Sequence, residues 1–367
     1  MPNALIKYRF LFAGGGTGGH LYPAIAVAQK IKELLPNSEI LFIGTKNKIE
    51  ARVVPQMNFR FKSIWISGFS RQLNFRNLIF PFKLIVSMIQ SLLICIKFKP
   101  HVAIGTGAYV SGPAMWGANI MGAKGVLLEQ NSYPGLTNRL LEKKVERIFL
   151  SFEESKKYFK DQAKLAVSGN PIRINIAQRN KAEAKSIYDL DVSKKTLVIV
   201  GGSLGAKTIN ESIKNNLQKL INLDIEILWQ TGAKYYDEFK NLQSSNVKVV
   251  KYFDDISIAY SVADLIIARA GATTIAEVAY LGLPVIFVPS PNVAANHQFK
   301  NADVLKKVNA AELIEDSKLN QQIVEKVEKL IFSANRLNEL SSNIQKFSKP
   351  EAVDIIANEI IKLASIT

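Results

Sequence analysis

The sequence contains the same local pattern twice, once near its start and once past its middle. Each copy is an apolar run, a glycine-rich turn and then a helical stretch; the turns are GGGTGGH at residues 14–20 and GGSLGA at residues 201–206. Glycines after a strand let main-chain N–H groups approach a phosphate, and the N-terminus of the following helix adds positive potential. The repeat therefore predicts an α/β chain of two Rossmann-like domains with a cleft between them.

The rest of the chain fits this organisation. Short β-branched or aromatic runs alternate with helix-length amphipathic stretches, which is typical of parallel sheets flanked by helices. A length of 367 residues also favours two domains. We expect an N-terminal domain over residues 1–170, a C-terminal domain over 171–349, and a terminal helix in 350–367 that packs back on the first domain. The predicted strands are 8–13, 39–43, 62–66, 102–104, 125–129, 147–150, 165–167, 196–200, 226–230, 247–252, 265–268 and 284–288.

The distribution of charge indicates an anionic partner. The net charge is +16, and no Asp or Glu occurs in residues 51–128. Basic side chains in that stretch alternate with aromatic and aliphatic ones, which favours an anionic membrane surface over a nucleic-acid groove. A nucleic-acid-binding module is the rival from another class, but no recognition helix or RNA-binding motif supports it, so we expect no nucleic-acid partner.

Residues 78–96 form the most apolar stretch of the chain. Pro81 and Lys83 interrupt it, and burying a lysine at the centre of a bilayer costs about 3 kcal/mol on insertion scales. We therefore expect an amphipathic element at a membrane surface rather than a membrane span. An ordinary core helix is the alternative.

Cysteine and histidine are too scarce for a disulfide framework or a metal site. The chain has one cysteine, Cys95, and three histidines, with no spacing that resembles a ligand set. This composition fits a reducing cytoplasm, and the first residues are expected to form a strand rather than a signal peptide. We expect no metal and no cofactor.

The first glycine loop does not fit a nicotinamide enzyme. Gly44-Thr45-Lys46 follow the second predicted strand, where such an enzyme carries an acidic ligand for the ribose. His20 closes the loop at a helix N-terminus, where an imidazole can act as a general base near neutral pH. A helix-capping or core histidine is the alternative.

The second half offers two further candidate binding segments. In residues 268–277, Gly271 and its small neighbours begin a helix after a predicted strand, and Glu277 lies about one turn further on. A carboxylate so placed can accept both hydroxyls of a ribose, although a solvated helix glutamate is the alternative. Residues 296–302, NHQFKNA, place amide and imidazole groups just after another predicted strand.

Taken together, the motifs resemble the MurG family of peptidoglycan N-acetylglucosaminyltransferases along essentially the whole chain. One motif would be suggestive, whereas the ordered set is highly specific. The matching segments are GGTGGHLYPA (15–24), GTGAYVSGP (105–113), EQN (129–131), GNPIR (169–173), GGSLGA (201–206), RAGATTIAE (269–277) and HQFKNA (297–302).

The resemblance implies a GT-B fold and an inverting glycosyltransferase. Such an enzyme moves N-acetylglucosamine from UDP-N-acetylglucosamine to lipid I, which is undecaprenyl-pyrophosphoryl-N-acetylmuramoyl-pentapeptide, and so forms lipid II for peptidoglycan synthesis. The resemblance also implies a peripheral place on the cytoplasmic face of the cell membrane, a role in cell shape and division, and cell-wall synthesis proteins as partners. The family has no bound catalytic metal, and the Asp189–Asp191 pair is expected to be a surface feature.

The resemblance also assigns roles to residues. His20 is the candidate catalytic base, or it positions the substrate; the main chain of Phe253 would read the uracil, and Glu277 would hold the ribose. Gly15 and Tyr109 are expected to bind the acceptor. The expected donor-binding residues are Thr17, Gly18, Gly19, Asn131, Arg173, Ser203, Phe253, Ala272, Thr273, Thr274, Ile275, Ala276, Glu277, Gln298 and Asn301.

Three positions depart from the family pattern. Leu204 stands where glutamine is frequent, Ala108 where glycine is frequent, and Thr273 where a larger apolar residue often occurs. None removes a group assigned to the chemistry. The rivals within the fold are a glycosyltransferase that makes glycolipids and a UDP-sugar epimerase.

Overall fold

The computed structural model describes residues 7–68, 78–172, 176–202 and 205–365. The chain forms two compact units. The first comprises residues 1–173 and 349–367, and the second comprises residues 174–348. Each unit has its own parallel sheet and its own hydrophobic core.

The first unit is built on a seven-stranded sheet in the order β3-β2-β1-β4-β5-β6-β7, and all neighbouring strands are parallel. Successive residues of β1 (Arg9–Ala13) point to opposite faces of the sheet, as strand geometry requires. Phe10 and Phe12 join the core on one side, and Leu11 and Ala13 join the core on the other. The strands are β1 Arg9–Ala13, β2 Glu39–Gly44, β3 Arg60–Ser63, β4 Val102–Gly105, β5 Lys124–Glu129, β6 Arg147–Leu150 and β7 Leu165–Val167.

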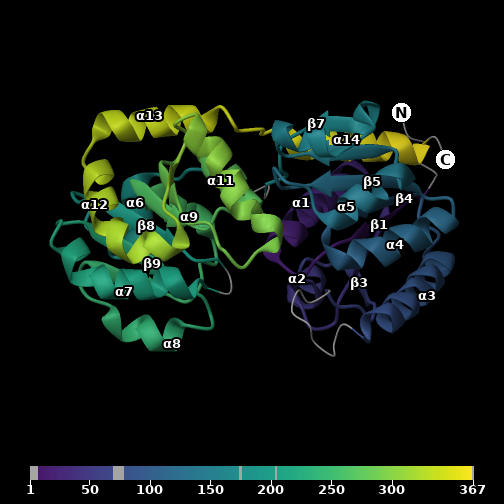
Figure 1. Ribbon diagram of the computed structural model, residues 1–367, viewed down its shortest axis with the longest axis horizontal. Helices are drawn as coiled ribbons and strands as arrows, with labels where there is room; N and C mark the ends of the chain where they lie inside the picture. The colour runs from purple at the N-terminus through teal and green to yellow at the C-terminus, as the bar shows by residue number, and fades with distance from the viewer. Residues whose placement is uncertain (1–6, 69–77, 173–175, 203–204, 366–367) are drawn as a thin grey trace. The chain divides into compact units, whose positions relative to one another are not determined.

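Helices cover both faces of this sheet. One of them comes from the far end of the sequence: α14 packs against α1, and its Ile356 and Ile360 lie in the same core as Phe10 (Figure 1). The α-helices are α1 Gly18–Leu34, α2 Ile49–Gln56, α3 Phe80–Phe98, α4 Ala108–Ile120, α5 Leu136–Leu141 and α14 Ala352–Ser365, with 3₁₀ turns at Glu142–Lys144, Glu153–Tyr158 and Gln162–Lys164.

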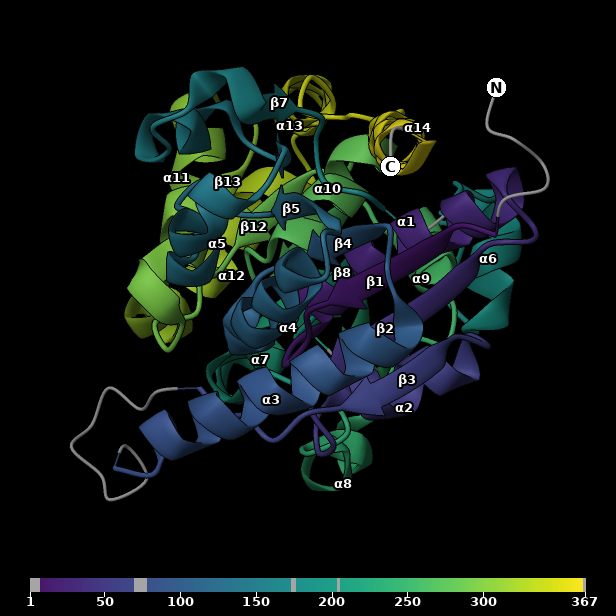
Figure 2. The same cartoon turned by 90° about the vertical axis from the view of Figure 1, so that its right-hand side faces the viewer.

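Helix α3 lies at the surface of the first unit beside α4 (Figure 2). Within the described residues it is the one helix whose length and composition would allow it to cross a membrane, and only 17% of the most apolar window is buried. Its buried side is unusual because two of its members, Ser87 and Ser91, are polar. The large apolar side chains Ile85 and Ile89 are 57% and 55% exposed. The side of α3 that carries Ile85 and Ile89 therefore faces away from the core of its own unit, whereas Cys95 and Phe98 lie in that core.

The second unit repeats the architecture with a six-stranded parallel sheet in the order β10-β9-β8-β11-β12-β13. Its strands are β8 Thr196–Val200, β9 Glu226–Gln230, β10 Val247–Val250, β11 Leu265–Ala268, β12 Val285–Phe287 and β13 Glu312–Leu313. The α-helices are α6 Lys181–Ile187, α7 Lys207–Ile221, α8 Tyr236–Phe239, α9 Ile256–Val262, α10 Ala272–Leu281, α11 His297–Lys307, α12 Leu319–Ile331 and α13 Ala334–Gln345, with 3₁₀ turns at Lys240–Leu242, Ala294–Asn296 and Asp316–Lys318.

Two strands differ from the sequence-based prediction. The third strand was expected at 62–66, but β3 runs from Arg60 to Ser63 at the edge of the sheet. Its pairing with β2 ends at Ser63, and the buried Ile64 and Ile66 that suggested a strand follow it. Strand β13 was missed because only its two residues pair with β12, too few for a period-two pattern. The other predicted strands are confirmed to within two residues at each end.

Candidate functional site

The first glycine loop follows β1 at the carboxyl edge of the sheet, and a buried carboxylate holds it in place. Glu50, in α2, accepts hydrogen bonds from Gly16 N (2.9 Å), Thr45 N (2.9 Å) and Thr45 Oγ1 (2.7 Å). A Cβ on Gly15 would come within 2.4 Å of the Glu50 carboxyl carbon, so glycine is required there. Gly16 has φ +79°, a conformation that favours glycine. Glu50 thus positions Gly15, an expected acceptor-binding residue.

His20 lies in the first turn of α1, immediately after this loop. Its Nδ1 is 2.8 Å from the carbonyl oxygen of Thr106 and 3.2 Å from Gln130 Oε1. Thr17 is the residue that precedes α1, and Gly18 and Gly19 are its first two residues. Main-chain N–H groups at such a helix start have no partner within the helix, so they can bind an anion. The structure therefore brings His20 together with Thr17, Gly18 and Gly19, three of the residues expected to contact the donor.

The end of β5 supports the same region through a buried carboxylate, Glu129. It accepts hydrogen bonds from Asn131 N (3.0 Å), Asn131 Nδ2 (3.3 Å), Gly135 N (2.9 Å) and Asn138 Nδ2 (2.8 Å). Burial raises the pKa of Glu129, and these hydrogen bonds together with the charge of His20 oppose that rise. The carboxylate fixes the side chain of Asn131, an expected donor-binding residue.

Tyr109 lies in the first turn of α4, near the first glycine loop. A Cβ on Gly16 would lie 3.9 Å from the Tyr109 hydroxyl. Burial raises the pKa of Tyr109, and a hydrogen bond with Thr45 opposes the shift. The preceding residue, Ala108, has φ +60°, a conformation that favours glycine. This explains why glycine is frequent at this position in the family that the sequence resembles. The two expected acceptor-binding residues, Gly15 and Tyr109, thus lie in the glycine loop and in the first turn of α4, close to it.

In the second unit, a short loop that ends at Gly271 joins β11 to α10, and α10 begins directly after Gly271. The first hydrogen bond within the helix runs from Ile275 N to Gly271 O at 2.9 Å, so the N–H groups of residues 272–274 precede it and form an open helix N-terminus. Thr273 Oγ1 is buried and has no hydrogen-bond partner among the described residues. Ala276, another expected contact, lies in the next turn. This arrangement suits a phosphate group.

Glu277, further along α10, is buried, with 3% of its surface exposed. The hydroxyl of Tyr260, in α9, donates a hydrogen bond of 3.0 Å to Glu277 Oε2. The alternative of a solvated helix glutamate is therefore wrong. Tyr260 was missed because nothing in the sequence relates α9 to α10.

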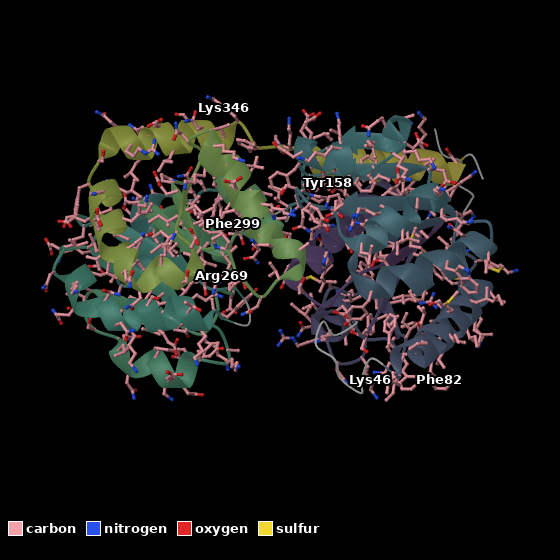
Figure 3. The ribbon with its side chains drawn as sticks, in the orientation of Figure 1. Lys46, Phe82, Tyr158, Arg269, Phe299 and Lys346 are labelled. Atoms are coloured by element: carbon pink, nitrogen blue, oxygen red, sulfur yellow. The ribbon has the colours of Figure 1, made fainter. Side chains whose placement is uncertain are left out.

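Arg269, labelled in Figure 3 within the second unit, stabilises the loop before α10. It forms an ion pair with Asp316, and both side chains are 15% exposed. It also donates a hydrogen bond of 3.0 Å to the carbonyl of Val288. The guanidinium thus joins the ends of β11, β12 and β13 at the carboxyl edge of the second sheet.

The remaining expected donor residues lie on other loops of that edge. Phe253 follows β10, is buried, and packs edge-on against Tyr188 with ring centroids 6.0 Å apart. Gln298 Oε1 accepts a hydrogen bond of 2.8 Å from Ser290 N, and Asn301 Nδ2 lies 3.4 Å from the carbonyl of Ala270. These contacts fix both amide side chains of α11 relative to the loops after β11 and β12.

Three positions of the prediction lie outside the described residues: Arg173, Ser203 and Leu204. Within the described residues, no three His, Cys, Asp or Glu side chains are grouped so that they could hold a metal ion. Asp189 and Asp191 are exposed, and Asp191 accepts hydrogen bonds from the main chain and hydroxyl of Ser193.

Comparisons with known proteins agree over nearly the whole chain. Residues 10–150 match the glycosyltransferase family 28 N-terminal domain, and residues 196–356 match its C-terminal domain. The UDP-N-acetylglucosamine–N-acetylmuramyl-(pentapeptide) pyrophosphoryl-undecaprenol N-acetylglucosamine transferase of Flavobacterium psychrophilum is 41% identical over 360 residues, which is 97% of this chain and 98% of the relative. The protein of the same name from Clostridioides difficile is 38% identical over 98% of this chain and 90% of the relative.

Solved structures show the same fold. The crystal structure of Acinetobacter baumannii MurG superposes with a TM-score of 0.75 at 26% identity, covering 97% of this chain and 99% of that one. The UDP-N-acetylglucosamine 2-epimerase of Neisseria meningitidis, solved with UDP-N-acetylglucosamine, has a TM-score of 0.67 at 15% identity over 97% of this chain and 100% of that one. At that identity, the likeness to the epimerase concerns the fold alone.

Proposed function

Because the chain belongs to the family of UDP-N-acetylglucosamine–N-acetylmuramyl-(pentapeptide) pyrophosphoryl-undecaprenol N-acetylglucosamine transferases, we propose that it transfers N-acetylglucosamine from UDP-N-acetylglucosamine to lipid I and so forms lipid II. The observation that carries this proposal is the 41% identity over 97% of the chain to relatives of that name. The chain is thus a GT-B glycosyltransferase of peptidoglycan synthesis.

His20 acts in this reaction as the base that accepts the proton of the acceptor hydroxyl. The deprotonated oxygen attacks the anomeric carbon of the donor sugar, and UDP leaves from the opposite face, so the configuration inverts. The contact of His20 Nδ1 with Thr106 O at 2.8 Å supports this role because Nδ1 is then occupied by Thr106. The other ring nitrogen, Nε2, lies on the opposite side of the ring and points away from Thr106. Gly15, in the glycine loop, and Tyr109, in the first turn of α4, bind the acceptor.

The second unit holds UDP and stabilises the charge that develops on it. The open N-terminus of α10 receives the pyrophosphate through residues 272–274 and the helix dipole, with Arg173 and Ser203 as further contacts. Glu277 accepts the ribose hydroxyls, and Tyr260 orients its carboxylate. Phe253 binds the uracil through its main chain, and Gln298 and Asn301 orient the sugar.

We further propose that the chain is a peripheral protein of the cytoplasmic membrane face and that α3 provides the contact. The undecaprenyl tail of the acceptor stays in the bilayer because each CH₂ group buried there is worth about 0.8 kcal/mol. The exposed apolar side of α3 and the adjoining basic residues Lys83, Lys97 and Lys99 suit an anionic lipid surface. The exposure of Ile85 and Ile89 speaks against the core-helix alternative. Residues 69–77, which belong to the same acid-free stretch and include the basic residues Arg71 and Arg76, lie outside the described residues.

A transfer assay tests the proposed activity. Radiolabelled UDP-N-acetylglucosamine is incubated with a short-chain lipid I analogue, and the disaccharide product is separated from the donor. We expect product only when both substrates are present. Conversion of UDP-N-acetylglucosamine to its 2-epimer without an acceptor would instead support the epimerase rival, and transfer to diacylglycerol would support the glycolipid rival.

A further inference from the structure

The imidazole of His20 meets two oxygen atoms at the same ring nitrogen. Nδ1 lies 2.8 Å from Thr106 O and 3.2 Å from Gln130 Oε1. A main-chain carbonyl can only accept a hydrogen bond. The amide group of Gln130 donates through Nε2 to the carbonyl of Leu128 at 3.2 Å, so its oxygen is the end that faces the imidazole. Both contacts therefore require a proton on Nδ1.

We propose that the carbonyl of Thr106 and the side chain of Gln130 hold neutral His20 in the Nδ1-protonated tautomer, which leaves the lone pair of Nε2 to accept the proton of the acceptor hydroxyl. Gln130 is a positioning residue in this arrangement, because it acts on the substrate through His20. The inference deepens the proposed function and rests on it for the identity of the hydroxyl. The tautomer itself can be observed without turnover.

The packing around the ring restricts it to this orientation. A Cβ on Gly107 would lie 3.1 Å from both Cε1 and Nδ1 of His20, so the ring lies directly against a residue without a side chain. Gly107 also has φ +96°, which other residues rarely adopt. Gln130 is buried at the end of β5, with 2% of its surface exposed. The two acceptors therefore occupy fixed positions relative to the ring.

Neutral acceptors have a different effect from the carboxylate that often accompanies a catalytic histidine. A carboxylate on Nδ1 both fixes the tautomer and stabilises the positively charged ring. The buried carboxylate of Glu129 interacts with the ring through its charge, while its oxygens accept hydrogen bonds from Asn131, Gly135 and Asn138. Thr106 and Gln130 fix the tautomer without adding a charge that would keep a proton on Nε2.

A second histidine in the same unit provides an internal reference. The main-chain N–H of Arg9 donates a hydrogen bond of 3.0 Å to Nδ1 of His101. Because Nδ1 is the acceptor there, the proton of neutral His101 must lie on Nε2. The structure thus predicts opposite tautomers for His20 and His101.

Nuclear magnetic resonance distinguishes these tautomers directly. The full chain is labelled with ¹⁵N only at histidine; three histidines give few signals, and the variants His20→Gln and His101→Gln assign them. Long-range ¹H–¹⁵N correlations at about pH 8, where unperturbed imidazoles are neutral, identify the protonated nitrogen. We expect Nδ1–H for His20 and Nε2–H for His101. An Nε2–H signal or a rapidly averaged pair for His20 would overturn the proposal.

The pH dependence of transfer tests the role of Gln130. The variant Gln130→Glu places a carboxylate at Nδ1, which stabilises the charged imidazole, so the acidic limb of the kcat/KM profile should move about one pH unit upward. Gln130→Met removes the acceptor and should lower kcat about 10-fold with little change in the KM for the donor. Gln29→Met, in the same helix as His20, is the matched control, and its profile should not change.

The outcomes separate this inference from the proposed function. Unchanged profiles and unchanged tautomers in both Gln130 variants would exclude a positioning role for Gln130. A chain that makes no lipid II would refute the proposed activity, whereas its His20 tautomer would still test the inference. If Gln130→Met unfolds, the Nε2–H signal of folded His101 is lost. The pH profile of Gln130→Glu then decides by itself whether Gln130 positions His20.

Discussion

The membrane contact proposed for α3 can be tested by removing two side chains that contribute little to its packing. Ile85 and Ile89 lie one turn apart on the outward side of the helix and are 57% and 55% exposed. Phe82, which is labelled in Figure 3 and precedes Ile85 by three residues, is less suitable because its ring packs against Trp65 with centroids 5.9 Å apart. We therefore choose the double variant Ile85→Ser with Ile89→Ser.

The expected effect follows from the exposed fractions. Complete burial of an isoleucine side chain is worth about 1.5–3 kcal/mol, so burying the exposed remainder of each should contribute about 1–1.5 kcal/mol. The pair then contributes roughly 2–3 kcal/mol, which is about a 30- to 150-fold change in lipid partitioning. Attraction of the nearby lysines to anionic lipid, about 1 kcal/mol each at low salt, remains in the variant.

The assay is sedimentation with liposomes of neutral and anionic lipid at fixed ionic strength. The matched control is Ile187→Ser, because Ile187 lies on α6 of the second unit and is also 57% exposed. We expect the double variant to lose lipid binding, to keep its melting temperature, and to keep its activity on a short-tailed acceptor. Unchanged partitioning would refute the membrane role of α3, and an equal loss in Ile187→Ser would show that the effect is not local.

Three further predictions concern the site and its loops. His20→Ala should lower turnover at least about 100-fold while UDP affinity stays, and retention of most turnover would exclude the role of base. Glu277→Ala should weaken UDP binding by about 2 kcal/mol in calorimetric titration, with unchanged affinity removing Glu277 from the ribose site. Ala108→Gly should raise the free energy of unfolding in urea by about 0.5–1 kcal/mol, since glycine keeps the left-handed conformation without the strain of about 1–2 kcal/mol that a Cβ brings and the added chain flexibility costs about 0.5–1 kcal/mol; the variant should be destabilised if φ +60° at Ala108 is not strained.

The strands and glycine loops could be predicted because their signals are local. An apolar run followed by glycines reports the end of a buried strand and the start of a helix. The β1 and β8 loops were found in this way, together with His20, which directly follows the first loop. Strand β13 has no such signal, since its pairing depends on where β12 lies in space.

The residues that hold the site in place could not be predicted, since they act across elements. Glu50 accepts a hydrogen bond from Gly16, which lies 34 residues away in the sequence. Gln130 contacts the ring of His20, which lies 110 residues away. Tyr260 contacts Glu277 from another helix. Glu50 had one local signal, its position in the first turn of α2, where a carboxylate complements the helix dipole. That signal predicts a stable helix start and says nothing of the glycine loop.

Helix α3 shows why composition alone cannot tell which side of an amphipathic helix is inside. Its polar residues Ser87 and Ser91 are buried, because small side chains let α3 approach α4 closely: a Cβ on Gly117 would lie 3.0 Å from the main-chain carbon of Ser91. Large apolar residues on the same side would hold the two helices apart. Several large apolar residues, Ile85 and Ile89 among them, are therefore left on the outer side, where water makes their exposure unfavourable. Because α3 packs against α4 through small side chains, the proposed membrane contact would add burial on the outer side without exchanging any contact within the first unit, and so would require no refolding of that unit.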